Sequence, residues 1–265
     1  MTTKRFERRA RQGIRLTARD LQIVVAVFEA RYLTNQMVAR LLFRPTTFST
    51  CKQRLRYLYD LGYLAKRAAY VNEPDVYYLG PQGVHYIASL GKFSQGEVQR
   101  IAGVSGGAAE APLLMMKHEL TLSRLYVNAR CECAQYGWSL EWRNARMLEL
   151  QKLGLQPDAW LEVKGSQRSK QAYLEFTAVM PTRSELASKV GGYEAHWRAV
   201  DAPIPVLWLA TSRNALNTLR QGLGSSEYKD YFLFGLVDEA GQFIAQRMWW
   251  WSESDEMIQW IKPPR

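Results

Sequence analysis

The chain has 265 residues, of which 47% are hydrophobic and 23% charged, and its formal net charge is +10. This composition is typical of a folded globular protein and argues against a disordered chain. The three cysteines, Cys51, Cys131 and Cys133, do not form the framework of a disulfide-rich secreted domain. With only three histidines in the chain, they do not have the spacing of a tetrahedral zinc site either.

No run of about eighteen apolar residues occurs in the sequence, which argues against a membrane-spanning helix. The basic N-terminus also lacks the apolar core of a signal peptide. We therefore expect a cytoplasmic protein that has no membrane partner.

The positive charge is concentrated in the first quarter of the chain. Residues 1–67 contain fifteen Lys and Arg against four Asp and Glu, whereas the remaining residues contain twenty and twenty-one. A basic module attached to a neutral body is typical of proteins that bind the phosphates of nucleic acids. A basic solubilising tail is the alternative, but residues 16–64 have the hydrophobic pattern of a folded module.

The chain is expected to begin with a flexible arm followed by three short helices. Residues 1–15 are polar and basic without a helical period, which predicts the arm. Thr17 and Thr34 have the residue type and the position of N-caps for the first two helices. The third helix is expected to start at Thr46 or Thr47.

Two short strands are expected after the third helix, at residues 63–67 and 76–79, on either side of a polar loop. A further helix is then expected to end near Leu90. Three helices followed by a two-stranded wing make a winged helix-turn-helix, a fold that binds double-stranded DNA. We therefore expect residues 16–90 to form a DNA-binding domain.

In a helix-turn-helix domain the N-terminal part of the recognition helix presents polar side chains to base edges. Hydroxyl, amide and cationic groups of the third helix are expected to do so here, and two cations of the wing to bind a flanking phosphate. The expected DNA-binding residues are Thr46, Thr47, Ser49, Thr50, Lys52, Gln53, Arg54, Arg56, Lys66 and Arg67. A winged helix used for protein contact is the alternative, which the local positive charge disfavours.

The rest of the chain predicts a linker and a second domain. Residues 91–112 are rich in Gly, Ala and Ser, as in a linker. A long helix over residues 113–135 then opens an α/β domain that is expected to extend to residue 265. Its strands are expected at 138–143, 156–163, 171–178, 205–211 and 230–237, and its further helices at 183–199 and 213–222.

Several segments resemble the replication-relaxation family of plasmids and other mobile elements. In the first half these are LTARDLQIVVAVFEARYLTNQMVARLLF, RLRYLYDLGYL and VYYLGPQG. In the second half, PDAWLEV, a strand with Glu175 and a helix with Lys189 and Tyr193 are similar to that family. The resemblance covers roughly residues 16–197. It implies a DNA-binding protein of a plasmid or mobile element that acts in replication, transfer or transcription control.

The second half also resembles the PD-(D/E)xK nuclease core, in which carboxylates on two strands hold Mg²⁺ and a lysine stabilises charge at the phosphate. Asp158 and Glu175 are the two acids, but Thr177 stands at the position of the motif lysine. Lys189, on the following helix, is the candidate substitute. We expect an inactive nuclease-like scaffold that requires no cofactor. The alternative is a Mg²⁺-dependent endonuclease in which Asp158 and Glu175 hold the metal and Lys189 is catalytic.

Trp249, Trp250 and Trp251 are consecutive in the sequence. Alternate side chains of a strand point to opposite faces, so the three cannot all lie in one core. They are therefore expected to contribute to a partner surface, with packing at a sheet edge as the alternative.

The expected architecture is mixed, α+β in the winged helix and α/β in the second domain. The second domain is expected to serve dimerisation, which makes the protein a homodimer, or to recruit a protein partner. A further alternative is an adaptor subunit of a larger nucleoprotein complex, with the three tryptophans as its docking face.

Overall fold

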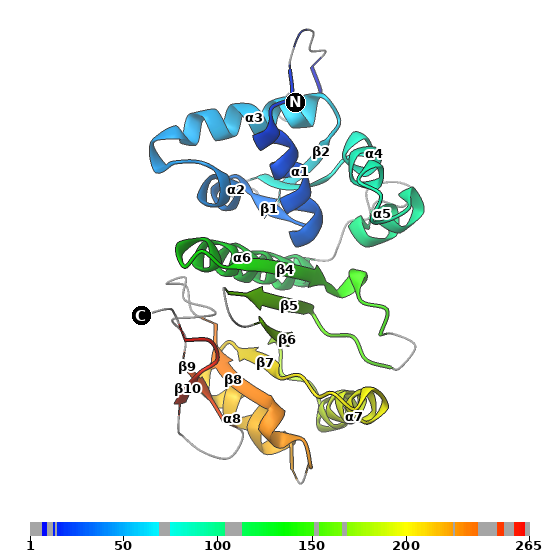
Figure 1. Cartoon of the computed structure of the whole chain (residues 1–265), viewed down its shortest axis with the longest axis vertical. Helices are drawn as coiled ribbons and strands as arrows, with labels where there is room; N and C mark the ends of the chain where they lie inside the picture. Colours follow the sequence, from blue (N-terminus) through cyan, green and yellow to red (C-terminus); the bar gives the residue numbers. More distant parts are fainter. Residues whose placement is uncertain are drawn as a thin grey trace. The chain divides into compact units, whose positions relative to one another are not determined.

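The fold is a mixed α+β arrangement, seen here in a computed structural model (Figure 1). The structure describes residues 7–9, 13, 15–68, 75–103, 113–150, 154–165, 169–224, 226–237, 248–251 and 257–262. The chain divides into two compact units, Met1–Val127 and Asn128–Arg265. The division falls within helix α6 (Leu113–Gln135), beyond the linker expected at residues 91–112.

The first unit combines helices with a three-stranded antiparallel sheet of order β1-β3-β2. Its elements before α6 are α1 (Ala18–Ala30), β1 (Leu33–Thr34), α2 (Asn35–Leu42), the 3-10 turn η2 (Pro45–Thr47), α3 (Phe48–Asp60), β2 (Leu64–Ala68), β3 (Asp75–Leu79), α4 (Pro81–Ser89) and α5 (Gln95–Ala102). The three helices and two strands expected between residues 16 and 79 are present. The strand β1 is an addition, too short to be found from a sequence pattern.

The first two helices start at the expected N-caps. Thr17 and Asp20 form a capping box, because the Thr17 hydroxyl accepts from the Asp20 backbone N–H (3.3 Å) and the Asp20 carboxylate accepts from the Thr17 backbone N–H (2.6 Å). At the start of α2, the hydroxyl of Thr34 accepts from the backbone N–H of Met37 (3.3 Å). These bonds satisfy backbone donors that have no partner inside the helix.

Glycines allow α4 to start close to the turn that follows α3. Gly62, after the end of α3, has a φ of 80°, in the left-handed region that favours glycine. The backbone N–H of Gly80 donates to the carbonyl of Tyr63 (2.8 Å). A Cβ on Gly83 would lie 2.3 Å from that same carbonyl oxygen. At Gly80 and Gly83, the two glycines of the segment GPQG, the backbone of the preceding turn is therefore too close to leave room for a side chain.

The start of α6 completes the core of the first unit. Met116 packs with Tyr32 and Val76 in one buried cluster. Glu119 forms an ion pair with Arg31, whose side chain is only 8% exposed. Arg31 follows α1 with a φ of 67°, a conformation that costs free energy for a residue other than glycine. The ion pair therefore holds the strained end of α1 in place.

A helix occupies part of the expected linker, so the linker prediction is wrong for residues 95–102. The helix α5 starts with a capping box in which Ser94 and Glu97 bond to each other's backbone N–H groups (3.3 and 2.8 Å). Val98 and Ile101 are buried. The high share of small residues concealed this short amphipathic pattern. Residues 104–112 of the expected linker lie outside the described residues.

The second unit is built on a seven-stranded mixed sheet of order β10-β9-β8-β7-β6-β5-β4. The strands are β4 (Ser139–Asn144), β5 (Ala159–Lys164), β6 (Ser169–Thr177), β7 (Val206–Ala210), β8 (Phe232–Leu236), β9 (Met248–Trp250) and β10 (Met257–Gln259). The central pairs β6–β7 and β7–β8 are parallel, and the outer pairs are antiparallel. The first five strands lie within three residues of the bounds expected from the sequence.

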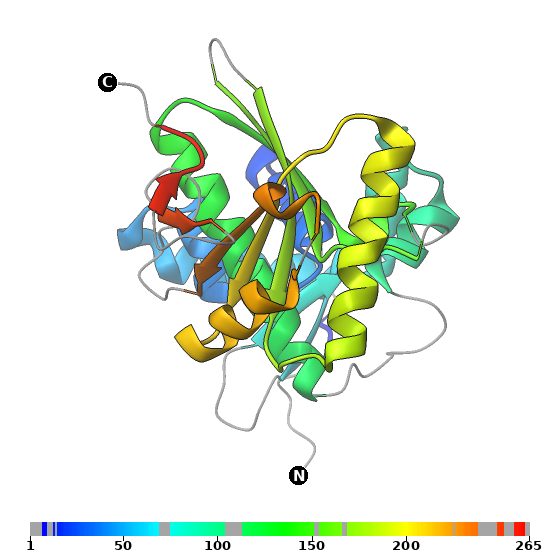
Figure 2. The ribbon, with the colours of Figure 1, turned by 90° about the horizontal axis from the view of Figure 1, so that it is seen from below.

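Two helices connect the parallel strands, as can be followed in Figure 2. They are α7 (Arg183–Val200) and α8 (Arg213–Gly222), with short 3-10 turns at η3 (Ala145–Met147) and η5 (Lys229–Tyr231). Tyr193 and Trp197 of α7 share one buried cluster with Leu219 of α8, Trp208 of β7 and Phe234 of β8. This face of the sheet is therefore a packed core. Within the described part of the chain, no helix has the length and apolar character needed to cross a membrane.

Candidate functional site

The N-terminal half of α3, with the turn before it, presents polar side chains to solvent. Cys51 and Leu55 are fully buried and fix which face of the helix points into the core. Thr47 is half-buried. The exposed residues are Thr46, Ser49, Thr50, Lys52 and Gln53. Hydroxyl, amide and ammonium groups of this kind can pair with base edges and with phosphates.

Arg54 is engaged within the first unit. Its Nε donates to Oδ1 of Asp20 (2.8 Å), and its Nη2 binds Oδ2 of the same carboxylate. Burial acts to raise the pKa of Asp20, but the hydrogen bonds from Arg54 and Thr17 outweigh it and hold this pKa below its ordinary value. We therefore assign Arg54 to the attachment of α3 to α1, in place of the base contact expected from the sequence.

The cations of the wing strands are also held by neighbours. Lys66 forms an ion pair with Asp75 on the adjacent strand (3.1 Å), and its side chain is only 6% exposed. The Lys66 ammonium also lies 5.1 Å from the centre of the Tyr59 ring. Arg67 is half-buried. Lys66 thus stabilises the strand pair and does not extend toward a flanking phosphate as expected.

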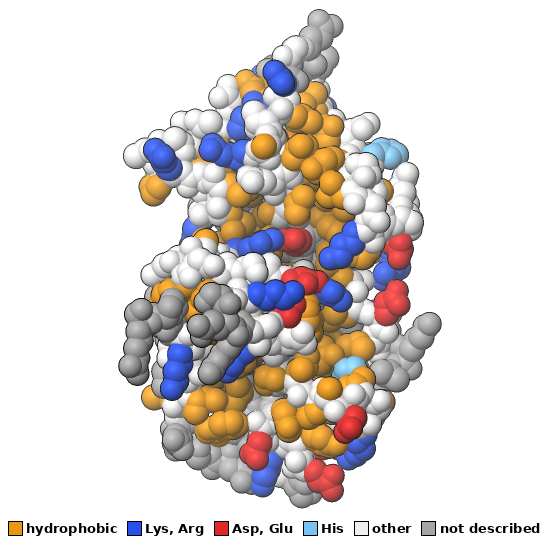
Figure 3. All heavy atoms as spheres, in the orientation of Figure 1, with side chains coloured by type: hydrophobic (Ala, Val, Ile, Leu, Met, Phe, Trp, Pro, Cys, Tyr) orange, Lys and Arg blue, Asp and Glu red, His pale blue; other side chains and the backbone are white. Residues whose placement is uncertain are grey.

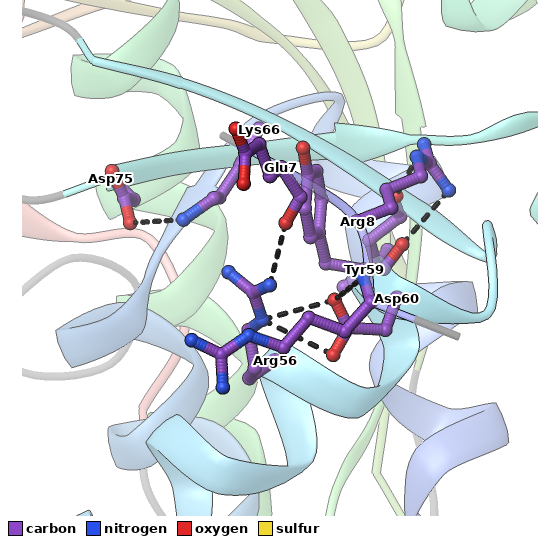
Figure 4. A network of polar contacts seen from close by, with 9 residues as sticks. Glu7, Arg8, Arg56, Tyr59, Asp60, Lys66 and Asp75 are labelled. Atoms are coloured by element: carbon purple, nitrogen blue, oxygen red, sulfur yellow. Dashed lines mark hydrogen bonds and ion pairs between the residues drawn. The ribbon is translucent and has the colours of Figure 1, made fainter. Parts of the chain in front are cut away.

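Residues 7–9 of the expected flexible arm lie against the C-terminal half of α3 (Figure 4). Arg56 donates to the backbone carbonyl of Glu7 (2.6 Å) and pairs with the carboxylate of Asp60 (3.0 Å). The backbone N–H of Arg9 donates to the same carboxylate (3.1 Å). The prediction of a flexible arm is therefore wrong for these residues. The polar composition of the arm gave no sign that its bonding partners lie about fifty positions later in the chain.

Three exposed arginines near the start of α3 were not among the expected site residues. Arg15 and Arg19 lie at the start of α1, and Arg44 lies in the turn before α3. The Arg54 side chain reaches the Arg15 carbonyl (3.4 Å), and the guanidinium of Arg19 lies 4.9 Å from the centre of the Phe43 ring. Figure 3 shows Lys and Arg side chains around α3, in the upper part of the view. These cations add positive charge beside the exposed polar half of α3.

In the second unit, Glu175 and Lys189 meet, as the motif analysis required for a nuclease site. The Lys189 ammonium binds Oε2 of Glu175, and the hydroxyl of Tyr193 donates to Oε1 (2.7 Å). Asp158 uses Oδ2 to accept from the backbone N–H of Phe176 (2.7 Å). The Lys189 and Tyr193 side chains reach Glu175 from α7, whereas the acids belong to β6 and to the approach to β5.

The charges of this cluster are strongly coupled. Burial and the nearby Asp158 together raise the pKa of Glu175 to about 7, against the opposing effects of Lys189 and Tyr193. Burial acts to lower the pKa of Lys189, but the carboxylates of Glu175 and Asp158 outweigh it and leave this pKa raised. Burial also raises the pKa of Tyr193 well above its ordinary value. Asp158 therefore lies within electrostatic reach of the other three groups.

The carboxylate at the centre of this cluster is bonded to two protein donors. Each oxygen of Glu175 already accepts one hydrogen bond, from Lys189 or from Tyr193, so a metal would share this carboxylate with two protein donors. Thr177, at the position of the motif lysine, accepts from the indole N–H of Trp208 (2.9 Å). In the ranges that the structure describes, no three His, Cys, Asp or Glu side chains are grouped so as to hold a metal ion. The arrangement is a closed polar cluster that ties α7 to β6.

The three consecutive tryptophans do not form a common surface. Trp249 is fully buried, and Trp250 packs against the core cluster of the second unit. Arg213 lies over the Trp250 ring, 4.5 Å from its centre. Trp251 is half-buried. The alternative interpretation, in which the tryptophans pack at the edge of the sheet, accounts for Trp249. Trp249 therefore does not belong to the expected partner surface.

Comparison with known proteins identifies one family. A family model described as replication-relaxation matches residues 26–207, which run from within α1 to within β7. No curated protein and no solved structure matched the chain. The match covers more than half of the chain and includes elements of both units, which confirms the family resemblance of the motifs.

Proposed function

Because the chain belongs to the replication-relaxation family, we propose that it acts in the replication or transfer of a plasmid or another mobile element, as a sequence-selective binder of double-stranded DNA. The family supports the setting. The DNA-binding role rests on one observation, the exposed polar half of α3 flanked by exposed arginines. The order α1-β1-α2-α3-β2-β3, with a β1-β3-β2 sheet, supports a winged helix-turn-helix in which α3 is the recognition helix.

In this proposal α3 enters the major groove with its N-terminal half. The major groove accepts an α-helix, and each base pair presents there a distinct pattern of donors and acceptors. Gln53 can read adenine through two hydrogen bonds, and the Ser49 and Thr50 hydroxyls can donate or accept. Arg19 and Arg44, near the start of the helix, would bind backbone phosphates and set its register.

The experiment selects duplexes from a random library with the full chain and compares two glutamine variants. Gln53→Ala should relax the selected consensus at one or two positions, because a lost bidentate base contact costs about 1–3 kcal/mol of discrimination. Gln99→Ala is the matched control, since Gln99 is an exposed glutamine on α5. An unselected library with the native protein, or equal relaxation by both variants, would reject the proposal.

A metal-dependent endonuclease is the second candidate function. It is favoured by the contact of Lys189 with Glu175 and by the proximity of Asp158, since these are the three groups that the nuclease motif needs. It is opposed by the uncharged Thr177 at the position of the motif lysine, and by the hydrogen bonds that Lys189 and Tyr193 already donate to Glu175. We therefore rank an inactive nuclease-like scaffold above it, and incubation of supercoiled DNA with the protein and Mg²⁺ distinguishes the two.

The second unit would then serve dimerisation or the recruitment of a protein partner. The full chain should sediment as a homodimer in analytical ultracentrifugation. If the protein is monomeric at all concentrations, the second unit does not serve dimerisation. Its proposed function is then the recruitment of a protein partner, including an adaptor role in a nucleoprotein complex. Co-purification with defined proteins of the same mobile element tests that role.

A further inference from the structure

We propose that Tyr57 is a positioning residue that holds the side-chain amide of Gln53 in one orientation, and that this orientation makes adenine the base that Gln53 selects. The inference rests on the proposed function and deepens it, because Gln53 must enter the major groove. The ligand groups are N7 and the N6 amino group of one adenine. Tyr57 acts through Gln53 and does not itself contact the base.

Gln53 and Tyr57 are bonded to each other on the surface of α3. They lie four positions apart, so their side chains are neighbours on one face of the helix. Nε2 of Gln53 donates to the hydroxyl of Tyr57 (2.7 Å). Gln53 is exposed, whereas Tyr57 is half-buried. The exposed side chain is thus bonded to one that its neighbours partly enclose.

Tyr57 is supported in turn by the ion pair that attaches α3 to α1. The guanidinium of Arg54 lies 5.3 Å from the centre of the Tyr57 ring. Arg54 binds Asp20, whose side chain is fully buried. A series of contacts therefore connects the core of the first unit with the Gln53 amide. Side chains that select a ligand depend on supporting residues of this kind to keep their geometry.

The contact with Tyr57 is compatible with the two hydrogen bonds that adenine offers. A glutamine amide has two N–H donors and one carbonyl acceptor. One N–H of Gln53 is donated to Tyr57, so the second N–H and Oε1 can pair with a base. On the major-groove edge of adenine, N7 accepts and the neighbouring N6 amino group donates. The second N–H and Oε1 of Gln53 supply the matching pair.

The orientation of the amide decides between adenine and guanine. The last torsion of a glutamine side chain is roughly two-fold, so an unsupported amide can turn over and exchange its oxygen and nitrogen. Guanine carries the O6 acceptor where adenine carries the N6 donor. An amide that turns over can donate to O6 and therefore tolerates guanine. With Nε2 held at Tyr57, Oε1 stays in place and repels O6.

The experiment measures the affinity of the full chain for two duplexes that carry A·T or G·C at the position that Gln53→Ala relaxes. The native protein should prefer adenine by about 5- to 150-fold, the range of a bidentate base contact. Tyr57→Phe removes only the hydroxyl and should reduce this ratio by about 2- to 10-fold, the effect of one lost hydrogen bond. Tyr86→Phe, at a half-buried tyrosine on α4, is the matched control and should leave the ratio unchanged.

Two further measurements separate positioning from a purely structural role. The double variant Gln53→Ala/Tyr57→Phe should have the same ratio as Gln53→Ala alone, because the hydroxyl acts only through the amide. For a duplex without the selected site, Tyr57→Phe should bind as tightly as the native protein. Thermal unfolding of each variant checks that the fold is kept.

The outcomes that overturn the inference are distinct from those that overturn the proposed function. A native protein without a selected consensus, or a consensus that Gln53→Ala does not relax, rejects the function and the positioning together. A base other than adenine at the relaxed position rejects the assigned ligand. An unchanged ratio in Tyr57→Phe, with the native consensus intact, rejects the positioning alone. Additive effects in the double variant also reject it, because Tyr57 would then act independently of Gln53.

Discussion

Arg54 of α3 binds both carboxylate oxygens of Asp20, which lies 34 positions earlier in the chain. The Asp20 side chain is fully buried, and it also completes the capping box of α1. One carboxylate therefore caps one helix and holds another. The orientation of α3, and with it the direction of its exposed half, depends on this ion pair.

Arg54→Ala should lower the free energy of unfolding by about 3 kcal/mol, because it leaves a buried carboxylate without its cation. Gln53→Ala, one position earlier and exposed, should change the same quantity by less than about 0.5 kcal/mol. Urea denaturation of both variants measures the difference. Equal losses of stability would contradict the structural assignment of Arg54.

Purified protein with Mg²⁺ or Mn²⁺ should leave linear and supercoiled DNA uncut, because the uncharged Thr177 stands at the position of the motif lysine, and Lys189 and Tyr193 already bind the Glu175 carboxylate. Asp158→Ala should retain DNA binding, since this residue belongs to the second unit. Gel assays of cleavage and of binding measure the two properties. Metal-dependent cleavage that is lost in both Asp158→Ala and Glu175→Ala would instead establish the endonuclease.

The raised pKa of Glu175 predicts a loss of stability between pH 4.5 and about 7. In this range the unfolded chain releases the proton of this carboxyl group while the folded chain retains it, so the free energy of the unfolded state falls relative to that of the folded state as the pH rises. Above pH 7 both states are ionised and the effect is constant. Glu175→Gln should lack this fall, as urea titrations across the range would show.

The pKa of Glu162 is shifted in the opposite direction to that of Glu175. Hydrogen bonds from Lys164 and Ser169 lower the pKa of Glu162 to about 2. Its contribution to stability is therefore present above pH 4.5 and is lost as the pH falls toward 2. Glu162→Gln should remove the loss of stability below pH 4.5. It should not change the fall in stability between pH 4.5 and about 7, which is assigned to Glu175. The same pH profile in both variants would contradict the two assignments.

Two helical glycines of the second unit should respond oppositely to alanine. Gly191 in α7 has open space where a Cβ would stand, so Gly191→Ala should stabilise the protein by about 0.5–1 kcal/mol. At Gly222 in α8 a Cβ would lie 2.1 Å from the side chain of the buried Leu186, so Gly222→Ala should destabilise by about 1–3 kcal/mol. Thermal unfolding of both variants checks the signs.

Much of the fold follows from local signals in the sequence. Thr17 and Thr34 are recognisable as N-caps because the bonds that they form span only three residues. The strand β4 is recognisable because its burial alternates with the pleat, whereas β7 and β8 are recognisable as short runs of buried residues. The helix α5 has only eight residues, and its Gly- and Ala-rich surroundings favoured a linker.

The site was less predictable, because its decisive contacts are long-range. Nothing near Arg54 in the sequence indicates that Asp20 will occupy it, and nothing near Lys66 distinguishes a paired from an exposed cation. Similarly, the spacing of Glu175 and Lys189 predicts that the two groups can meet. It does not show that the Tyr193 hydroxyl donates to the other oxygen of the Glu175 carboxylate. Residue type and spacing thus identified the segments that carry the candidate sites. Ion-pair and hydrogen-bond partners, which the sequence does not reveal, determine which side chains remain exposed.

The parallel pairing of β6, β7 and β8 has a consequence for the order of folding on the ribosome. Parallel strands need crossover connections, so the central sheet cannot assemble until β8, at residues 232–236, has been synthesised. The first unit is complete at Val127. At a translation rate of about 5–20 residues per second, the nascent chain carries a complete first unit for about 5–20 s before the central sheet can assemble. A ribosome that stalls in this interval would therefore hold a nascent chain that carries the α3 surface without an assembled second unit.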